Sequence, residues 1–159
     1  MGCDIHVFLE KRNKETNKWE HLTLYKKNYD DKLEPASVFD GRNYYLFGLL
    51  AGVRGFVEPL VDPRGIPDDL SDYVAEEWKS WDGDAHTPTW YDFCELDAYE
   101  RSINSKRNAP AVDDDEYDDY DYANRGFVYF MGNIRCVLDA YWMWYPEPHE
   151  VRVIMWFDN

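Results

Sequence analysis

The sequence has few cysteines and few basic residues, and it has no long apolar run. Its three cysteines, Cys3, Cys94 and Cys136, lie far apart, so they form no paired zinc-binding motif and predict no obligatory disulfide framework. Lysine and arginine number 17 against 32 aspartates and glutamates, a formal net charge of −15. This balance argues against direct binding to nucleic-acid backbones, which needs clustered basic residues. The absence of a membrane-length apolar run and of a basic-then-apolar leader predicts a soluble, cytoplasmic protein.

The composition that is present predicts a folded chain. At 159 residues, 45% of them apolar and 18% aromatic, the chain suffices for a single domain with one hydrophobic core. The excess of acids is uneven, because the run Asp113–Tyr122 holds seven acids and three tyrosines. Such an excess is compatible with solubility, with cation binding, or with imitation of a polyanion.

Both ends of the sequence alternate between apolar and polar residues, as a half-buried β-strand does. In residues 2–10 the odd positions are apolar, and residues 151–159 alternate in the same way. If the two strands pair antiparallel with residue numbers that sum to 162, three pairs face each other: Asp4 and Asp158, His6 and Trp156, and Glu10 and Arg152. One end of this strand pair then brings two carboxylates close together.

The residues between these strands predict one more strand and several helices. A strand is expected over residues 19–25, and helices are expected over about 43–53, 71–79, 89–103 and 127–142, with Asn43 and Thr89 as N-caps. The remaining segments are expected to be loops or turns, including 26–40, 56–70, 82–86 and a linker, 104–125, that contains the acidic run. This order predicts an α+β fold: a single domain, residues 1–159, with a mainly antiparallel sheet, adjacent terminal strands and helices packed on one face.

Several short motifs occur in an order that resembles a family of phage and bacterial proteins. They are Gly2-Cys3-Asp4-Ile5-His6, Gly41-Arg42-Asn43-Tyr44, Pro63-Arg64-Gly65-Ile66-Pro67, His86 ahead of Trp90, and Trp156-Phe157-Asp158-Asn159. Thr87 and Tyr91 depart from the pattern, in which Ser follows the histidine and Leu follows the tryptophan. The resemblance implies a phage-related context and supplies no mechanism.

A metal site is predicted where the terminal strands meet. Asp4 and His6 share one face of a strand, and Asp158 is expected beside them. Two carboxylates about 4 Å apart repel by roughly 4 kcal/mol at an effective dielectric near 20, so a shared proton, an arginine or a cation must relieve them. With a histidine nearby, a divalent ion is one solution, Mn or Zn before Ca. In the plain alternative, Asp4 and His6 bond to each other and to Arg42 or Arg54.

Four loop residues and one helix cap complete the predicted site. His86, with Asp84 in the same turn, could complete the metal shell or act as general base, although it could equally be a surface histidine that caps the next helix. Arg42, Asn43 and Arg64 are the expected substrate-binding residues, because two converging arginines suit a phosphate. Alternatively, the arginines only neutralise the protein's own carboxylates.

The leading functional hypothesis is a small metal-dependent hydrolase that acts on a phosphorylated or nucleotide substrate. The first alternative is an acidic binding protein that either inhibits a host nucleic-acid enzyme by DNA mimicry or sequesters a nucleotide signal. The second alternative is a structural or assembly protein. The expected partners are a small phosphorylated ligand or a host protein, with no direct nucleic-acid binding and no membrane.

Overall fold

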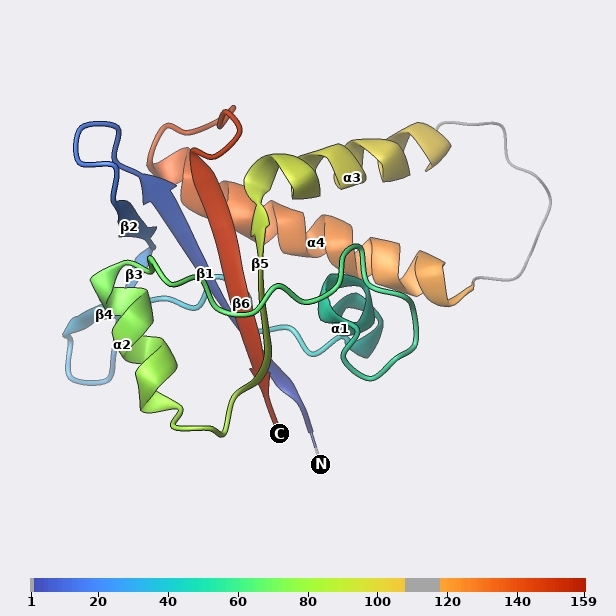
Figure 1. Ribbon diagram of the computed structural model, residues 1–159, viewed down its shortest axis with the longest axis horizontal. Coiled ribbons are helices and arrows are strands. Elements are labelled where there is room, and N and C mark those ends of the chain that lie inside the picture. The colour runs from blue at the N-terminus through green and yellow to red at the C-terminus, as the bar shows by residue number, and fades with distance from the viewer. Residues whose placement is uncertain (1, 108–117) are drawn as a thin grey trace.

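The computed structural model describes residues 2–107 and 118–159, which form four helices and two antiparallel sheets. The larger sheet has the strand order β2-β1-β6-β5 (Figure 1). Its strands are β1 (Asp4–Arg12), β2 (Trp19–Leu22), β5 (His86–Asp92) and β6 (Val151–Asp158). The smaller sheet is a hairpin of β3 (Tyr25–Lys27) and β4 (Leu33–Pro35).

The terminal strands pair in the predicted register. Across β1 and β6 the facing residues are Asp4 and Asp158, His6 and Trp156, and Glu10 and Arg152. Figure 1 shows the two ends of the chain side by side at one end of the sheet. The predicted α+β class, with a single compact domain and adjacent terminal strands, is therefore confirmed.

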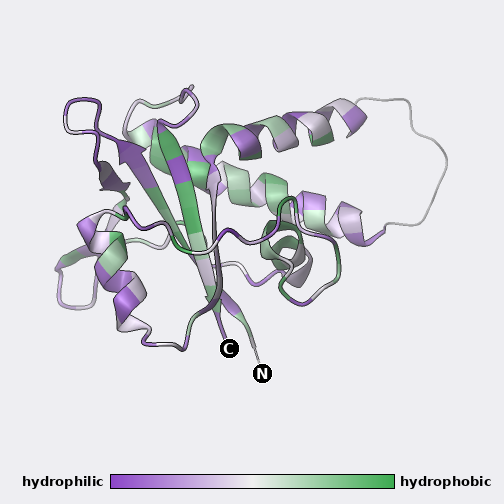
Figure 2. Cartoon of the chain, viewed as in Figure 1, coloured by the Kyte–Doolittle hydropathy of each residue, from purple (hydrophilic) through white to green (hydrophobic). Residues whose placement is uncertain are grey.

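Strand β6 lies between β1 and β5, and both faces of the sheet are buried along it, because core clusters pack on its two sides. Residues 151–157 are all buried, and Figure 2 shows the strand as largely hydrophobic. The odd residues of β6 face the larger core, whereas Ile154 and Trp156 face a second, smaller cluster. This accounts for a nearly continuous apolar run, which is typical of a strand covered on both sides.

Three helices cover the larger core: α1 (Tyr44–Ala51), α3 (Phe93–Arg107) and α4 (Asp119–Ala140). The buried residues of α4 include Phe127, Phe130, Ile134 and Val137, which follow the helical spacing predicted from the sequence. The fourth helix, α2 (Asp72–Ser80), lies on the opposite face. There Val74 is fully buried, and the ring of Trp78 lies 5.2 Å from that of Trp156. The face that carries His6 is therefore covered by a helix.

The start of α1 shows how side chains fix the packing of helices. Asn43 is its N-cap, as predicted, and its side-chain oxygen accepts a hydrogen bond from the Leu46 backbone N–H at 3.0 Å. Gly126 of α4 packs against this cap so closely that a Cβ there would lie 2.4 Å from Asn43 Nδ2. A side chain at position 126 would therefore force Asn43 to shift where α4 crosses the beginning of α1.

The segment before α3 differs from the prediction. Residues 86–92 form strand β5 and not a turn followed by a helix start at Thr89. The residue that caps α3 is Asp92, whose carboxylate accepts from the Cys94 backbone N–H at 2.9 Å, while Glu95 accepts from the Asp92 N–H at 2.9 Å. Pairing with the apolar strand β6 outweighs the local helix-start pattern.

The connection between α3 and α4 is also shorter than the predicted linker, residues 104–125. Helix α3 extends to Arg107, and α4 begins at Asp119 with a reciprocal capping box between Asp118 and Asp121. Part of the acidic run thus forms the first turn of a helix, where the helix dipole stabilises negatively charged side chains. The rest of the predicted linker, including residues 113–117, lies outside the described residues. No helix of the described chain is both long and apolar enough to cross a membrane.

Candidate functional site

At the end of the sheet, Asp4 and Asp158 face each other, and Arg42 neutralises the first of them. Arg42 Nε and Nη2 donate to Asp4 Oδ1 at 2.9 and 2.6 Å, and the Asp4 backbone N–H donates to Asp158 Oδ1 at 3.2 Å. The hydrogen bonds to Asp4 raise the pKa of Arg42. The guanidinium packs against Gly2, where a Cβ would lie 2.7 Å from Arg42 Nη1. An arginine therefore relieves the carboxylate repulsion, one of the solutions expected from the sequence.

His6 lies beside the same carboxylates. Its Nε2 is 3.4 Å from Asp158 Oδ2, and its ring packs 4.3 Å from that of Trp81. Nε2 is buried and makes no hydrogen bond with any described group. Asp4, His6 and Asp158 are thus brought together, yet within residues 2–107 and 118–159 no three His, Cys, Asp or Glu side chains are arranged to hold a metal. The predicted metal site remains a prediction, and an ion here would compete with Arg42 for Asp4 Oδ1.

The predicted catalytic pair lies elsewhere. His86 is opposite Phe157 of β6, and their rings are 6.1 Å apart. Because facing residues share a side of the sheet, His86 lies on the larger-core side, away from His6. Its Nδ1 is 2.9 Å from Thr87 Oγ1. Asp84 is exposed in the preceding turn, where its backbone N–H donates to the Trp81 carbonyl at 2.8 Å, and among the described residues no hydrogen bond or ion pair joins the side chain of His86 or Asp84 to Asp4, His6 or Asp158.

Of the predicted substrate-binding residues, only Arg42 lies at the terminal site. Asn43 caps α1, and Arg64 forms a two-pronged ion pair with Glu95, at 2.7 and 2.6 Å. The hydrogen bonds in this pair raise the pKa of Arg64 and lower that of Glu95. The arginines therefore do not converge on one ligand position.

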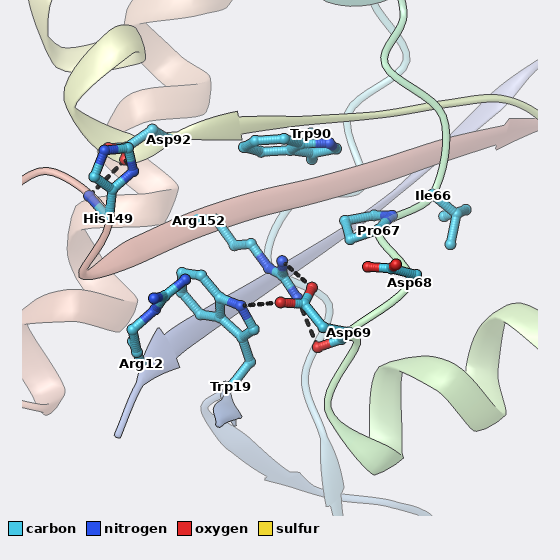
Figure 3. Close-up of a pocket in the computed structure, with 10 residues that line it drawn as sticks. All are labelled: Arg12, Trp19, Ile66, Pro67, Asp68, Asp69, Trp90, Asp92, His149 and Arg152. Atoms are coloured by element: carbon cyan, nitrogen blue, oxygen red, sulfur yellow. Dashed lines mark hydrogen bonds and ion pairs between the residues drawn. The ribbon is translucent and has the colours of Figure 1, made fainter. Parts of the chain in front are cut away.

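A hollow lies at the other end of the sheet, on the α2 side. This hollow, which we call the Trp90 cleft, has a volume of about 510 Å³. Its lining (Figure 3) consists of Arg12, Trp19, Ile66, Pro67, Asp68, Asp69, Trp90, Asp92, His149 and Arg152. Measured along β1 at about 3.3 Å per residue, it is roughly 25 Å from the terminal carboxylates. Its volume lies within the range of small-molecule sites.

A network of paired charges, in which Glu10 and Arg152 are buried and Asp69 is exposed, forms the floor of the cleft. Arg152 donates to Glu10 Oε2 at 2.7 Å and to Asp69 Oδ1 at 2.7 Å, and Glu10 is fully buried. The second oxygen of Glu10 accepts from the Ser71 backbone N–H at 2.7 Å. Burial opposes ionisation of Asp69, but the hydrogen bonds and charge of Arg152 outweigh it and lower the pKa of the carboxyl. The side chains of the floor are therefore held in place, and the carboxylates already have Arg152 as their cationic partner.

Trp19 and Trp90 form the aromatic part of the wall. Two guanidinium groups lie over the Trp19 ring, those of Arg12 at 4.8 Å and of Arg152 at 4.1 Å. The Arg64 guanidinium lies 4.9 Å from the Trp90 ring. Figure 3 shows Trp90 nearly edge-on, with one face turned into the cleft. Trp90 thus offers a flat aromatic surface to a ligand.

Two charged groups on the wall have no charge partner. Arg12 forms no ion pair with any described carboxylate, and its Nη1 donates to Asn17 Oδ1 at 3.2 Å. Across the cleft, Asp68 is exposed, and its carboxylate has no hydrogen bond or ion pair with the described part of the chain. The cleft can therefore offer one cation and one carboxylate to a ligand.

The rim carries a histidine and an aspartate in contact. Asp92 Oδ2 accepts from the His149 backbone N–H at 2.6 Å and lies 3.2 Å from His149 Nδ1. The His149 side chain is 83% exposed. Asp92, His149 and Trp90 line a second hollow as well as the Trp90 cleft. This second hollow has a volume of about 490 Å³, and Arg64 and Cys94 also line it.

Comparison of the chain with protein-family models, curated proteins and solved structures found no match. The cleft itself was not predicted from the sequence, because its lining comes from six separate segments of the chain. The pairing of Glu10 with Arg152 was predicted, and it was the one available indication of where the floor lies.

Proposed function

We propose that this protein binds a small molecule that carries a planar nitrogen heterocycle and one anionic group, the chemistry of a nucleoside monophosphate. The observation that supports the proposal best is the presence of Arg12, a cation without a carboxylate partner among the described residues, in the same cleft as the open face of Trp90. In a chain with 32 acids and 17 basic residues, such an arginine is a notable feature. The proposed role is sequestration of a nucleotide-class ligand.

Each part of such a ligand has a counterpart in the cleft. The ring would stack on Trp90, a contact that contributes about 1–3 kcal/mol per base. The anionic group would pair with Arg12, because a guanidinium matches phosphate oxygens. An exocyclic amino group would donate to the free carboxylate of Asp68. Because the lining also includes Asp69 and Asp92, each added phosphate should weaken binding, and a monophosphate should bind better than a triphosphate.

The test is a calorimetric titration of the protein with the 5′-monophosphates of adenosine, guanosine, cytidine and uridine. Trp90→Ala should weaken binding about 10- to 100-fold, and Arg12→Gln should weaken it and reduce its dependence on salt. Trp144→Ala is the matched control, because Trp144 is 56% exposed and does not line the cleft. If none of the four nucleotides binds saturably, or if Trp90→Ala binds as the unchanged protein does, the proposal is wrong.

A metal-dependent hydrolase at the terminal carboxylates is the second candidate. It is favoured by the position of His6 Nε2, which is buried, makes no hydrogen bond with a described group and lies 3.4 Å from Asp158 Oδ2. Asp4, His6 and Asp158 would hold Mn or Zn, and the ion would lower the pKa of its water to make the nucleophile. Elemental analysis of the purified protein, with Asp4→Ala and His6→Ala as controls, tests this. Absence of stoichiometric metal from the unchanged protein would exclude it.

A further inference from the structure

The turn after α4 exposes an unusual number of large aromatic side chains. Residues 141–145 read Tyr-Trp-Met-Trp-Tyr, and Trp142, Trp144 and Tyr145 are 77%, 56% and 92% exposed. The rings of Trp142 and Trp144 meet edge to face at 5.5 Å. Concentrated exposed apolar surface of this kind marks interaction sites on soluble proteins more often than isolated residues do.

The turn holds these side chains in a defined arrangement. The Tyr141 hydroxyl donates to the Thr23 carbonyl at 2.8 Å and accepts from the Thr23 N–H at 3.2 Å, while Met143 packs against the larger core. The backbone N–H groups of residues 141–143 bond to carbonyls in the last turn of α4. Tyr141 and Met143 thus point inward and anchor the turn, Trp142 lies between them, and the ring of Trp144 packs against that of Trp142.

Trp142 also has a backbone conformation that bulky residues rarely adopt. Its φ is 59°, in the left-handed region, where a large side chain is sterically disfavoured. Strain of this kind persists where the surrounding structure enforces it, and it is concentrated at functional positions. A pair of indoles fixed before binding loses little conformational entropy when a partner arrives.

The charges beside the indoles indicate the chemistry of the partner. Asp139 and Glu147 flank the turn and are exposed, and neither carboxylate has a hydrogen bond or ion pair with the described residues. Glu150, three residues after Glu147, is paired instead, with its carboxylate 3.7 Å from Lys14 Nζ. Two aromatic faces beside two free carboxylates match an arginine side chain, which stacks on indoles and pairs with carboxylates.

We propose that Trp142 and Trp144 form a docking surface for an arginine-bearing segment of a basic partner protein. The net charge of −15 would speed the approach of such a partner. A symmetric dimer through this turn would bring Asp139 and Glu147 against their own copies, so like charges would oppose it. The same carboxylates oppose docking on an anionic lipid surface. This surface is separate from the Trp90 cleft, and the proposal does not depend on the ligand proposed there.

The test uses two blocked hexapeptides, hexa-arginine and hexa-lysine, titrated by calorimetry at moderate salt. The unchanged protein should bind hexa-arginine several-fold more tightly than hexa-lysine, because only the guanidinium stacks. The double variant Trp142→Asn/Trp144→Ala should lose that preference and about 5- to 10-fold in affinity for hexa-arginine. Asparagine is chosen at 142 because it tolerates the left-handed conformation.

Two further variants keep the test decisive. Asp139→Asn/Glu147→Gln retains both indoles and should weaken both peptides alike, which detects the charge contribution without altering the aromatic pair. Tyr29→Ala, a control at an exposed aromatic residue of another turn, should bind the hexapeptides as the unchanged protein does. Equal affinity of the two peptides, or unchanged binding by Trp142→Asn/Trp144→Ala, would overturn the proposal. So would a dimer that this double variant dissociates, or vesicle binding that it abolishes.

Discussion

Glu10 and Arg152 face each other across β1 and β6 and are joined at 2.7 Å in a region where Glu10 is fully buried and Arg152 is 5% exposed. Asp69 and the Ser71 N–H complete the hydrogen bonding of the pair. The pair therefore ties the central strands of the sheet to the segment that leads into α2.

Arg152→Ala should lower the free energy of unfolding by about 3–5 kcal/mol, because it leaves the Glu10 carboxylate buried without its cation. Urea unfolding followed by circular dichroism measures this. The control is Arg101→Ala, which removes an ion pair with Asp97 in which the arginine is 72% exposed, and it should cost less than about 0.5 kcal/mol. Equal effects in the two variants would mean that burial adds nothing to the Glu10–Arg152 pair.

Gly126→Ala should destabilise the protein even though alanine favours helices by about 1 kcal/mol. The added methyl group would collide with Asn43 Nδ2, at 2.4 Å, and would crowd Leu46 Cβ, at 3.2 Å. In an Asn43→Ala background the first collision disappears, so the same substitution should cost less by about 1 kcal/mol or more. A double-mutant cycle of urea unfolding provides the measurement, and strict additivity would contradict the close contact.

The unfolding free energy should fall as the pH is lowered from about 6.5 to about 4, in part because of His21. Burial lowers the pKa of His21 to about 4, and its ring stacks on Tyr73 at 4.3 Å. The unfolded chain takes up a proton near pH 6.5, whereas the native chain takes it up only near its lower pKa, so acid favours unfolding in this window. Partial solvent contact limits the effect to about 1–2 kcal/mol.

His21→Gln should remove that part of the pH dependence, as measured by urea unfolding at about pH 7 and about pH 4.5. A His21→Gln protein with the full original slope would show that other groups cause it.

Arg42→Gln should increase the affinity of the terminal carboxylates for Mn²⁺ or Zn²⁺ if these residues form a metal site. Arg42 donates two hydrogen bonds to Asp4 Oδ1 and so competes with a metal ion for that oxygen. Calorimetric titration with each metal provides the measurement, and Arg42→Gln/His6→Ala should lose the gain. If Arg42→Gln binds neither metal, the second functional candidate fails together with this prediction.

The register of the terminal strands was predictable because β1 alternates cleanly and because one pairing matches Glu10 with Arg152. The Asn43 cap was predictable for a similarly local reason. Strand β5 was not, since its pairing with β6 shifts between His86 and Thr89, and Thr87 has a φ of 48°. Such an irregularity hides the alternation that identifies a strand.

The candidate site was less predictable than the fold. Asp4, His6 and Asp158 lie together as expected, but nothing local to His86 or Arg64 indicated that β5 and Glu95 would hold them elsewhere. The Trp90 cleft depends on contacts between segments as distant as Arg12, Trp90 and Arg152, which have no common spacing in the sequence. The His6 face also carries Phe8 and Trp156, and both pack in the smaller cluster beside α2.

The place of β6 between β1 and β5 has a consequence for biosynthesis. A ribosome makes β1, β2 and β5 before it makes β6, so the sheet lacks its middle strand until translation has passed residue 158. Until then β1 and β5 present unpaired backbone edges that can template wrong pairing with other chains. The nascent protein should therefore depend on chaperones, or on rapid completion, more than its modest size suggests.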